Sequence, residues 1–150
     1  MVCLYLGAID LLAGRLIILG LERTGPVMAN IPLISVVDDD NSVRDSVGGL
    51  LRSVSFGVVV FASAEEFLSS NRARETDCLI LDVRMPGMNG FELQSRLAAC
   101  HLEMPVIFIT AHGDEELRSR ALRGGAVDFL LKPFSEEALL TAVQAALSPK

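Results

Sequence analysis

Residues Leu79–Gly90, LILDVRMPGMNG, give the clearest indication of how this chain folds. It begins as an unbroken apolar run and reaches a single carboxylate, Asp82, after which Pro86 and Gly87 require a turn. A run of this kind is typical of a central strand in a parallel sheet, which is covered on both faces. Asp82 would then lie at the carboxyl end of a central strand, where open α/β sheets bind ligands. A single aspartate before a turn is more often a helix cap or a turn residue than a functional one. Whether Asp82 is functional therefore depends on which residues follow the other predicted strands.

Length and composition predict one globular domain. The chain has 150 residues, of which 51% are apolar and 21% charged. Its net charge of −6 argues against direct binding of nucleic acid, which needs a basic patch, and permits a carboxylate cluster that binds a cation. The cysteines, Cys3, Cys78 and Cys100, show no metal-ligand spacing. Their odd number favours a reducing cytoplasm over a disulfide framework, and Cys78 is expected to be a small core residue.

Residues 1–27 form an N-terminal leader that differs from the rest. Its longest uncharged run, residues 1–9, is far shorter than the roughly 20 residues of a membrane span, and it lacks the basic start of a signal peptide. Binding to a membrane is therefore not the expected role of this leader. Three interpretations remain: a loosely packed extra helix, a weak membrane-surface segment, or upstream sequence from too early a start codon. The last is favoured because Met28 is a natural alternative start, and residues 28–150 are then the domain proper.

From Leu33 onward, short apolar strands alternate with helical patterns. We expect strands at 33–37, 57–61, 77–83, 105–110 and 127–131. We expect helices from a cap at Asn41 or Ser42 to about 54, from the capping-box pair Ser63 and Glu66 to 68, and at 89–99, 114–123 and 135–147, with a polar loop at 69–76. Alternation of this kind predicts an α/β fold with a doubly wound, five-stranded parallel sheet and five helices.

Polar side chains stand at the ends of four predicted strands: the acidic triplet Asp38–Asp40, then Asp82, Thr110 and Lys132. Parallel strands end at the same edge, so these groups can converge. Carboxylates gathered in one pocket repel one another, and Mg²⁺ removes that conflict with all-oxygen ligation. A carboxylate beside Mg²⁺ can accept a phosphoryl group, while Lys132 and Thr110 meet its other oxygens. The simpler interpretation of Lys132 is a salt bridge to Asp82.

These motifs resemble the receiver domain of bacterial response regulators over residues 32–147. The similarity is carried by VDD at 37–39, LDVRMPGMNG at 81–90, ITAHG at 109–113 and GAVDFLLKPF at 125–134. The resemblance implies a flavodoxin-like sheet of strand order 2-1-3-4-5. The threonine and glycine motifs are most similar to receivers joined to a helix-turn-helix output domain. The leader has no counterpart in the family, and the chain stops shortly after the last helix.

The resemblance also implies residue roles. Asp82 is the expected phosphoacceptor, Asp39 a direct Mg²⁺ ligand, and Asp38 a ligand that acts mainly through water. Asp40 is expected to be peripheral. The backbone carbonyl of Arg84 is the third expected protein ligand. Three further expectations are Thr110 and Phe129 as the switch pair, Lys132 as the phosphate-binding lysine, and a cis peptide between Lys132 and Pro133.

The implied function is a phosphoacceptor in a two-component phosphorelay, a signalling domain that promotes its own phosphorylation and dephosphorylation rather than an enzyme. The expected partners are a sensor histidine kinase or a histidine phosphotransfer protein, with a homodimer on phosphorylation. The alternative is a receiver fragment of a DNA-binding regulator. A haloacid-dehalogenase-type phosphatase would need a second Asp where Arg84 stands. A flavodoxin would need a loop rich in Ser, Thr and Gly where Asp38–Asp40 stands.

Overall fold

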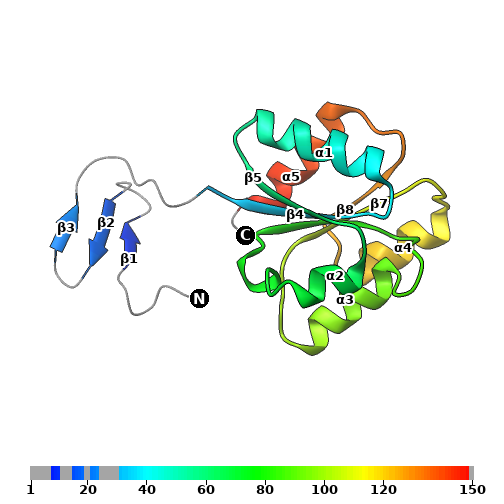
Figure 1. The fold of residues 1–150 in the computed structure, drawn as a ribbon, viewed down its shortest axis with the longest axis horizontal. Helices are drawn as coiled ribbons and strands as arrows, with labels where there is room; N and C mark the ends of the chain where they lie inside the picture. Colours follow the sequence, from blue (N-terminus) through cyan, green and yellow to red (C-terminus); the bar gives the residue numbers. More distant parts are fainter. Residues whose placement is uncertain (1–7, 11–14, 19–20, 24–30, 149–150) are drawn as a thin grey trace. The chain divides into compact units, whose positions relative to one another are not determined.

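The structure, a computed structural model, describes residues 8–10, 15–18, 21–23 and 31–148 (Figure 1). The chain divides into two compact units, Met1–Ile31 and Pro32–Lys150. The boundary lies after Ile31, close to the predicted boundary after residue 27.

The described residues of the first unit form a small antiparallel sheet. Its strands are β1 (Ala8–Asp10), β2 (Arg15–Ile18) and β3 (Leu21–Arg23), in the order β1-β2-β3. Asp10 and Arg15, the two charges that interrupt the apolar pattern of the leader, are register partners across β1 and β2. The interpretation of this segment as a helix is therefore wrong for the described residues, which pair as strands.

The second unit is built on a five-stranded sheet in which every pairing is parallel. The strands are β4 (Leu33–Val37), β5 (Gly57–Phe61), β6 (Cys78–Asp82), β7 (Val106–Thr110) and β8 (Asp128–Leu131). Their spatial order is β5-β4-β6-β7-β8, which confirms the predicted order 2-1-3-4-5. Every residue of β6 and β7 is buried, as expected for apolar runs covered on both faces.

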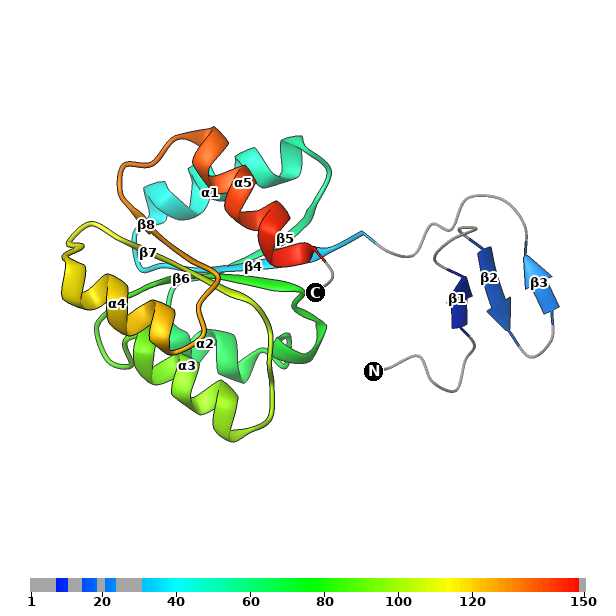
Figure 2. The same cartoon turned by 180° about the vertical axis from the view of Figure 1, so that it is seen from behind.

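Helices cover both faces of this sheet (Figures 1 and 2). On one face, α1 (Asn41–Ser53) and α5 (Glu136–Leu147) pack over a core that includes Leu51, Ile80 and Leu139. On the other face, α2 (Ala64–Ser69), α3 (Gly90–Ala99) and α4 (Glu115–Arg123) pack over a core that includes Phe67, Leu81 and Phe108. Cys78 lies in the first of these cores, fully buried, as predicted.

Side-chain caps set where the helices begin. Ser63, Asn89, Asp114 and Ser135 each accept a hydrogen bond from a backbone N–H of the first turn of α2, α3, α4 and α5. The predicted cap of α1 was wrong: Asp40, rather than Asn41 or Ser42, is the N-cap. Its carboxylate accepts from the Ser42 N–H at 2.8 Å, because that N–H has no partner within the helix.

The remaining differences from the predicted elements are small. Glu66 does not close a capping box on Ser63; its carboxylate accepts instead from the Ala62 N–H at 2.7 Å. The predicted polar loop at 69–76 contains one 3₁₀ turn, η1 (Ala73–Glu75). Among the described residues, the helices are all too short or too polar to span a bilayer.

Candidate functional site

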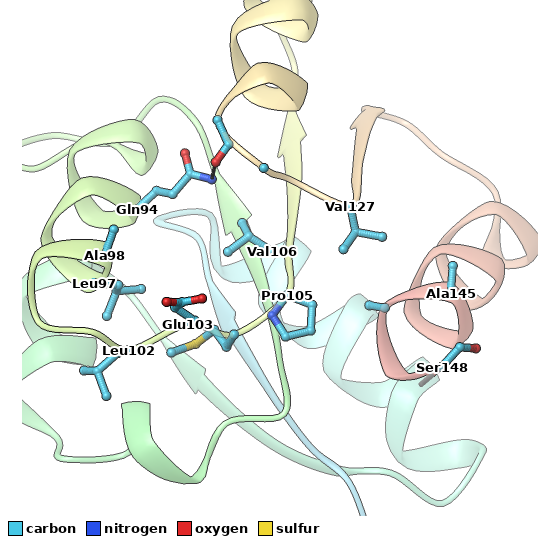
Figure 3. Close-up of a pocket in the computed structure, with 14 residues that line it drawn as sticks. Gln94, Leu97, Ala98, Leu102, Glu103, Pro105, Val106, Val127, Ala145 and Ser148 are labelled. Carbon is cyan, nitrogen blue, oxygen red and sulfur yellow. Dashed lines mark hydrogen bonds between the residues drawn. The ribbon is translucent and has the colours of Figure 1, made fainter. Parts of the chain in front are cut away.

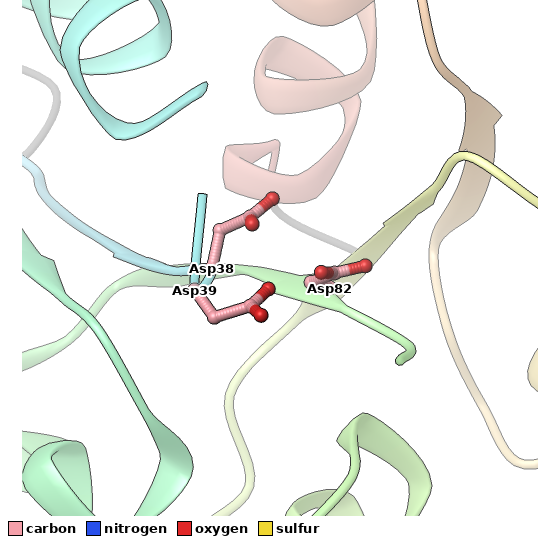
Figure 4. Close-up of side chains that lie close together, drawn as sticks. All are labelled: Asp38, Asp39 and Asp82. Carbon is pink, nitrogen blue, oxygen red and sulfur yellow. The ribbon is translucent and has the colours of Figure 1, made fainter. Parts of the chain in front are cut away.

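Three carboxylates meet at the carboxyl edge of the five-stranded sheet. Asp38 and Asp39 follow β4, and Asp82 ends β6, the strand next to it (Figure 4). One carboxylate oxygen from each lies within 4.8 Å of the others. Asp38 and Asp82 are buried, whereas Asp39 is exposed. The predicted convergence of these side chains is therefore present, with one member open to solvent.

Lys132 reaches into this cluster from the end of β8. Its Nζ lies 2.7 Å from Asp38 Oδ2 and 3.7 Å from Asp82 Oδ2. The sequence suggested Asp82 as the salt-bridge partner, but the nearer carboxylate is that of Asp38. The Lys132 backbone N–H donates to the Thr110 carbonyl at 2.8 Å, and the peptide before Pro133 is cis, as expected. The Lys132 ammonium therefore lies next to two carboxylates, Asp38 after β4 and Asp82 at the end of β6, and these two strands are neighbours in the sheet.

The surroundings of the Asp82 carboxyl disfavour its ionised form. Burial raises its pKa from 3.8 to about 7, and the nearby Asp38 carboxylate adds to the rise. Lys132 and the Arg84 N–H lower the pKa, while Asp39 raises it slightly. The Arg84 N–H donates to Asp82 Oδ1 over a long 3.4 Å, so this bond stabilises the ionised form only slightly. A cation among the three oxygens would stabilise it more, because positive charge favours the ionised form.

Thr110 and Phe129 lie beside this edge on β7 and β8. Both side chains are buried. Thr110 Oγ1 accepts from the His112 N–H at 3.1 Å. A Cβ placed on Gly113 would lie 3.1 Å from a Phe129 ring carbon and 3.5 Å from the Thr110 methyl group, so the two side chains flank the same backbone position. The structure brings the predicted switch pair together.

The turn after Asp82 is positioned by close packing. The Val83 N–H donates to the Ile109 carbonyl at 3.1 Å, and the Gly90 N–H donates to the Val83 carbonyl at 2.9 Å. A side chain on Gly90 would collide with the backbone carbonyl of Asp82, so α3 can begin this near only with glycine. Asn89 and Glu92 close a capping box, which fixes the direction in which α3 leaves the site.

One residue near the site was missed by the sequence analysis. Arg44 in α1 donates from Nη1 to the Asp38 carbonyl at 2.7 Å and from Nη2 to Asn41 Oδ1 at 3.0 Å. It therefore holds the backbone of the acidic segment from outside the carboxylate cluster. No local signal marks it, since an arginine in the first turns of an exposed helix face is ordinary.

A separate hollow of about 600 Å³ lies at the opposite, amino edge of the sheet (Figure 3). It is bounded by the ends of α3 and α5, and its lining includes Leu97, Leu102, Pro105, Val106 and Ala145. Among the described residues that line it, Glu103 is the only charged one. This hollow lacks the reactive groups gathered at the carboxyl edge.

Comparison with known proteins identifies the class to which this fold and site belong. Residues 34–144 match the sequence family described as the response regulator receiver domain. The chain belongs to this family, whose members receive signals in two-component systems. This confirms the resemblance deduced from the four motifs.

Similar proteins have the same domain. Nodulation protein W of Bradyrhizobium diazoefficiens is 51% identical over 114 residues, which are 76% of this chain and 50% of that protein. Response regulator protein TodT of Pseudomonas putida is 45% identical over 115 residues, which are 77% of this chain and 51% of that protein. The structure of response regulator StyR is 49% identical with a TM-score of 0.73, covering 79% of this chain and 60% of that one. The chain spans about half the length of the curated relatives it matches.

Proposed function

We propose that Asp82 is the phosphoacceptor of this receiver and takes a phosphoryl group from a sensor histidine kinase or a histidine phosphotransfer protein. The observation that carries the proposal is the meeting of three carboxylates within 4.8 Å beside the Lys132 ammonium. In the step proposed, an Asp82 oxygen attacks phosphorus, the P–N bond to the donor histidine breaks, and an acyl phosphate forms. The imidazole leaves with the bonding electron pair.

The surrounding side chains support this step. Lys132 can neutralise a phosphoryl oxygen, because its ammonium already lies between Asp38 and Asp82. The Thr110 hydroxyl accepts a hydrogen bond from the His112 N–H, and its own proton can be donated to another oxygen. Thr110 and Phe129 form the proposed switch that carries the phosphorylated state to α4, β8 and α5.

The site fits Mg²⁺ by its donor set. We infer that Asp39 and Asp82 bind the cation directly, Asp38 mainly through water, and the Arg84 carbonyl as the third protein ligand. Mg²⁺ bound there supplies positive charge that offsets the mutual repulsion of the carboxylates and of the incoming phosphoryl oxygens. The pKa of Asp82, raised first by burial and then by the Asp38 carboxylate, supports this assignment, because a nearby cation would favour the ionised form.

Phosphorylation with acetyl phosphate tests the proposal. Intact mass should show one added phosphoryl group that requires Mg²⁺ and is removed by hydroxylamine. Asp82→Ala should lose the adduct, while the control Glu103→Gln, at the other end of the sheet, should keep it. If Asp82→Ala still takes up phosphate at the wild-type rate, the assignment is wrong.

A second candidate is a receiver that works within a longer DNA-binding regulator. Its support is the similarity to proteins named transcriptional regulatory proteins, TdiR of Thauera aromatica and FixJ of Bradyrhizobium diazoefficiens, of which this chain spans 52% and 56%. Mass spectrometry of the protein made from its natural gene would decide between the two. We also propose a cytoplasmic location; the free thiols of Cys78 and Cys100 fit a reducing compartment.

A further inference from the structure

The loop between β6 and α3, residues 84–88, is tied to α2 by one side chain. Glu65 Oε2 accepts a hydrogen bond from the Met88 N–H at 3.0 Å, across 23 residues of sequence. Among residues 31–148, this is the one hydrogen bond that joins the loop at residues 84–88 to a helix other than α3, which follows the loop. The other, from the Arg84 N–H to Asp82 Oδ1, is local and long at 3.4 Å.

Gly87 is shaped to receive this carboxylate. Its φ is +76°, a conformation that L side chains rarely adopt, and a Cβ there would lie 2.8 Å from Glu65 Oε2. The turn of the backbone therefore needs glycine, and a Cβ at this position would displace the Glu65 carboxylate from where it lies.

On the side of the loop that faces α4, Met85 is buried in the core beside an open hollow. This hollow of about 490 Å³ is lined on the loop by Arg84, Met85 and Pro86 and on α4 by Leu117 and Arg120. Met85 therefore anchors the loop through its apolar side chain, whereas the hydrogen bond that ties the loop to a neighbouring helix comes from Glu65. Glu65 can accept this bond because it lies in the first turn of α2, which the Ser63 cap fixes.

We propose that Glu65 is a positioning residue for the phosphoacceptor site. By holding the Met88 N–H, it fixes the loop that carries Arg84, whose backbone carbonyl is the third inferred ligand of the cation. This inference rests on the proposed function, since it assigns Glu65 a role in the cation affinity of that site. Glu65 itself touches neither the cation nor the phosphoryl group.

The neighbouring Glu66 provides a matched control. It lies in the same helical turn, is also exposed, and accepts one backbone N–H bond, from Ala62 at 2.7 Å. Glu65→Ala and Glu66→Ala therefore each remove one negative charge and one hydrogen bond of the same kind. A merely structural or long-range electrostatic role of Glu65 predicts equal effects of the two substitutions on Mg²⁺ binding.

The test is a Mg²⁺ titration of the full chain, followed by amide NMR shifts at Asp39 and Val83. We expect Glu65→Ala to raise the Mg²⁺ Kd about tenfold, as is usual when a group that orients a metal ligand is lost. Glu66→Ala should stay within about twofold of wild type, and so should Glu65→Gln, because the amide oxygen still accepts the N–H bond. Gly87→Ala should also weaken binding, because its Cβ would displace the Glu65 carboxylate from the Met88 N–H and strain the turn.

Several results would overturn the inference. Equal Kd values for Glu65→Ala and Glu66→Ala would do so, as would a Glu65→Gln variant as weak as Glu65→Ala, or an unchanged Gly87→Ala. These failures differ from failure of the proposed function. In that case the wild-type chain itself would neither bind Mg²⁺ at these residues nor take phosphate at Asp82.

Discussion

Buried polar side chains near the two ends of the sheet differ in how well their hydrogen bonds are satisfied. Thr76 lies at the amino edge, just before β6, and its Oγ1 is 2.7 Å from the hydroxyl of Ser35, which is buried in the middle of β4; Thr76 Oγ1 in turn donates to the Arg72 carbonyl at 2.8 Å. Since the one Thr76 proton is used there, Ser35 is the donor to Thr76. At the carboxyl edge, Asp82 is also buried, but among the residues that the structure describes its polar partners are the Arg84 N–H at 3.4 Å and the Lys132 ammonium at 3.7 Å.

This difference separates polar groups that stabilise the fold from those that bind a cation in the proposed function. A buried hydroxyl with a donor and an acceptor in place stabilises the fold and has nothing left to offer a ligand. Crowded carboxylates with one ammonium between them cost stability, and a cation among them would offset that cost. The two edges should therefore respond to substitution with opposite signs.

The largest effect is expected at the carboxyl edge, from Asp82→Asn. It should abolish phosphorylation and stabilise the metal-free chain by about 1–3 kcal/mol near pH 8. Folding raises the pKa of the Asp82 carboxyl from 3.8 to about 7, so the folded state holds this proton more tightly than the unfolded state. The resulting stability is complete below the unfolded pKa of 3.8 and is lost as the pH rises through about 7.

Urea unfolding in EDTA measures this prediction. The advantage of Asp82→Asn over wild type should shrink when the pH falls from about 8 to about 5, because the wild-type carboxyl takes up a proton. Added Mg²⁺ should stabilise the wild-type chain more than the variant. An advantage that is the same at both pH values would contradict the link to ionisation.

At the amino edge, Thr76→Val should do the reverse. It should destabilise the fold by about 1–3 kcal/mol, because the buried Ser35 hydroxyl loses its acceptor. Phosphorylation by acetyl phosphate should continue near the wild-type rate, since the change lies at the other end of the strands. Urea unfolding and intact mass measure the two properties.

The double variant Ser35→Ala, Thr76→Val is the control for this comparison. It should recover part of the lost stability, because no unpaired hydroxyl is left buried. A large loss of phosphorylation in Thr76→Val would mean that the two edges are coupled rather than independent.

Thr110→Ala, again at the carboxyl edge, should change signalling with only a modest change in stability. The variant should still accept phosphate but respond weakly, because no hydroxyl is left to bond a phosphoryl oxygen. Hydrogen exchange across residues 110–145, with and without beryllofluoride, measures the response. The α4 segment should show it most, since Ala121 is its one fully buried residue. A wild-type chain that shows no change, or a variant that shows the same change, would contradict the switch.

The smallest effect is expected from the leader, which belongs to neither edge. A chain that starts at Met28 should melt within a few degrees of the full chain and should be phosphorylated at the same rate. The chain divides after Ile31, and the five-stranded unit has its own core on both faces of the sheet. Aggregation of the shortened chain, or a loss of several kcal/mol, would show that the leader covers part of that core.

Much of the site could be predicted because it depends on local patterns. Apolar runs set the strands, and a carboxylate, a hydroxyl and an ammonium follow them at Asp82, Thr110 and Lys132. The parallel topology then brings those ends to one edge, so the cluster follows from sequence once the alternation of strands and helices is recognised. The cap of α1 at Asp40 was missed because three adjacent carboxylates and two further polar residues all suit that role.

The order of the elements, the sheet and the set of residues at its carboxyl edge could all be predicted from the amino-acid sequence. How those residues pair depends on the packing of the folded chain. Lys132 lies nearer to Asp38 than to Asp82, and Glu65 in α2 accepts a hydrogen bond from the Met88 N–H in the loop before α3. Such choices turn on differences of about an ångström between groups far apart in the chain, and hydrophobic periodicity and turn signals contain no information at that scale. The register of packed strands and helices supplies it.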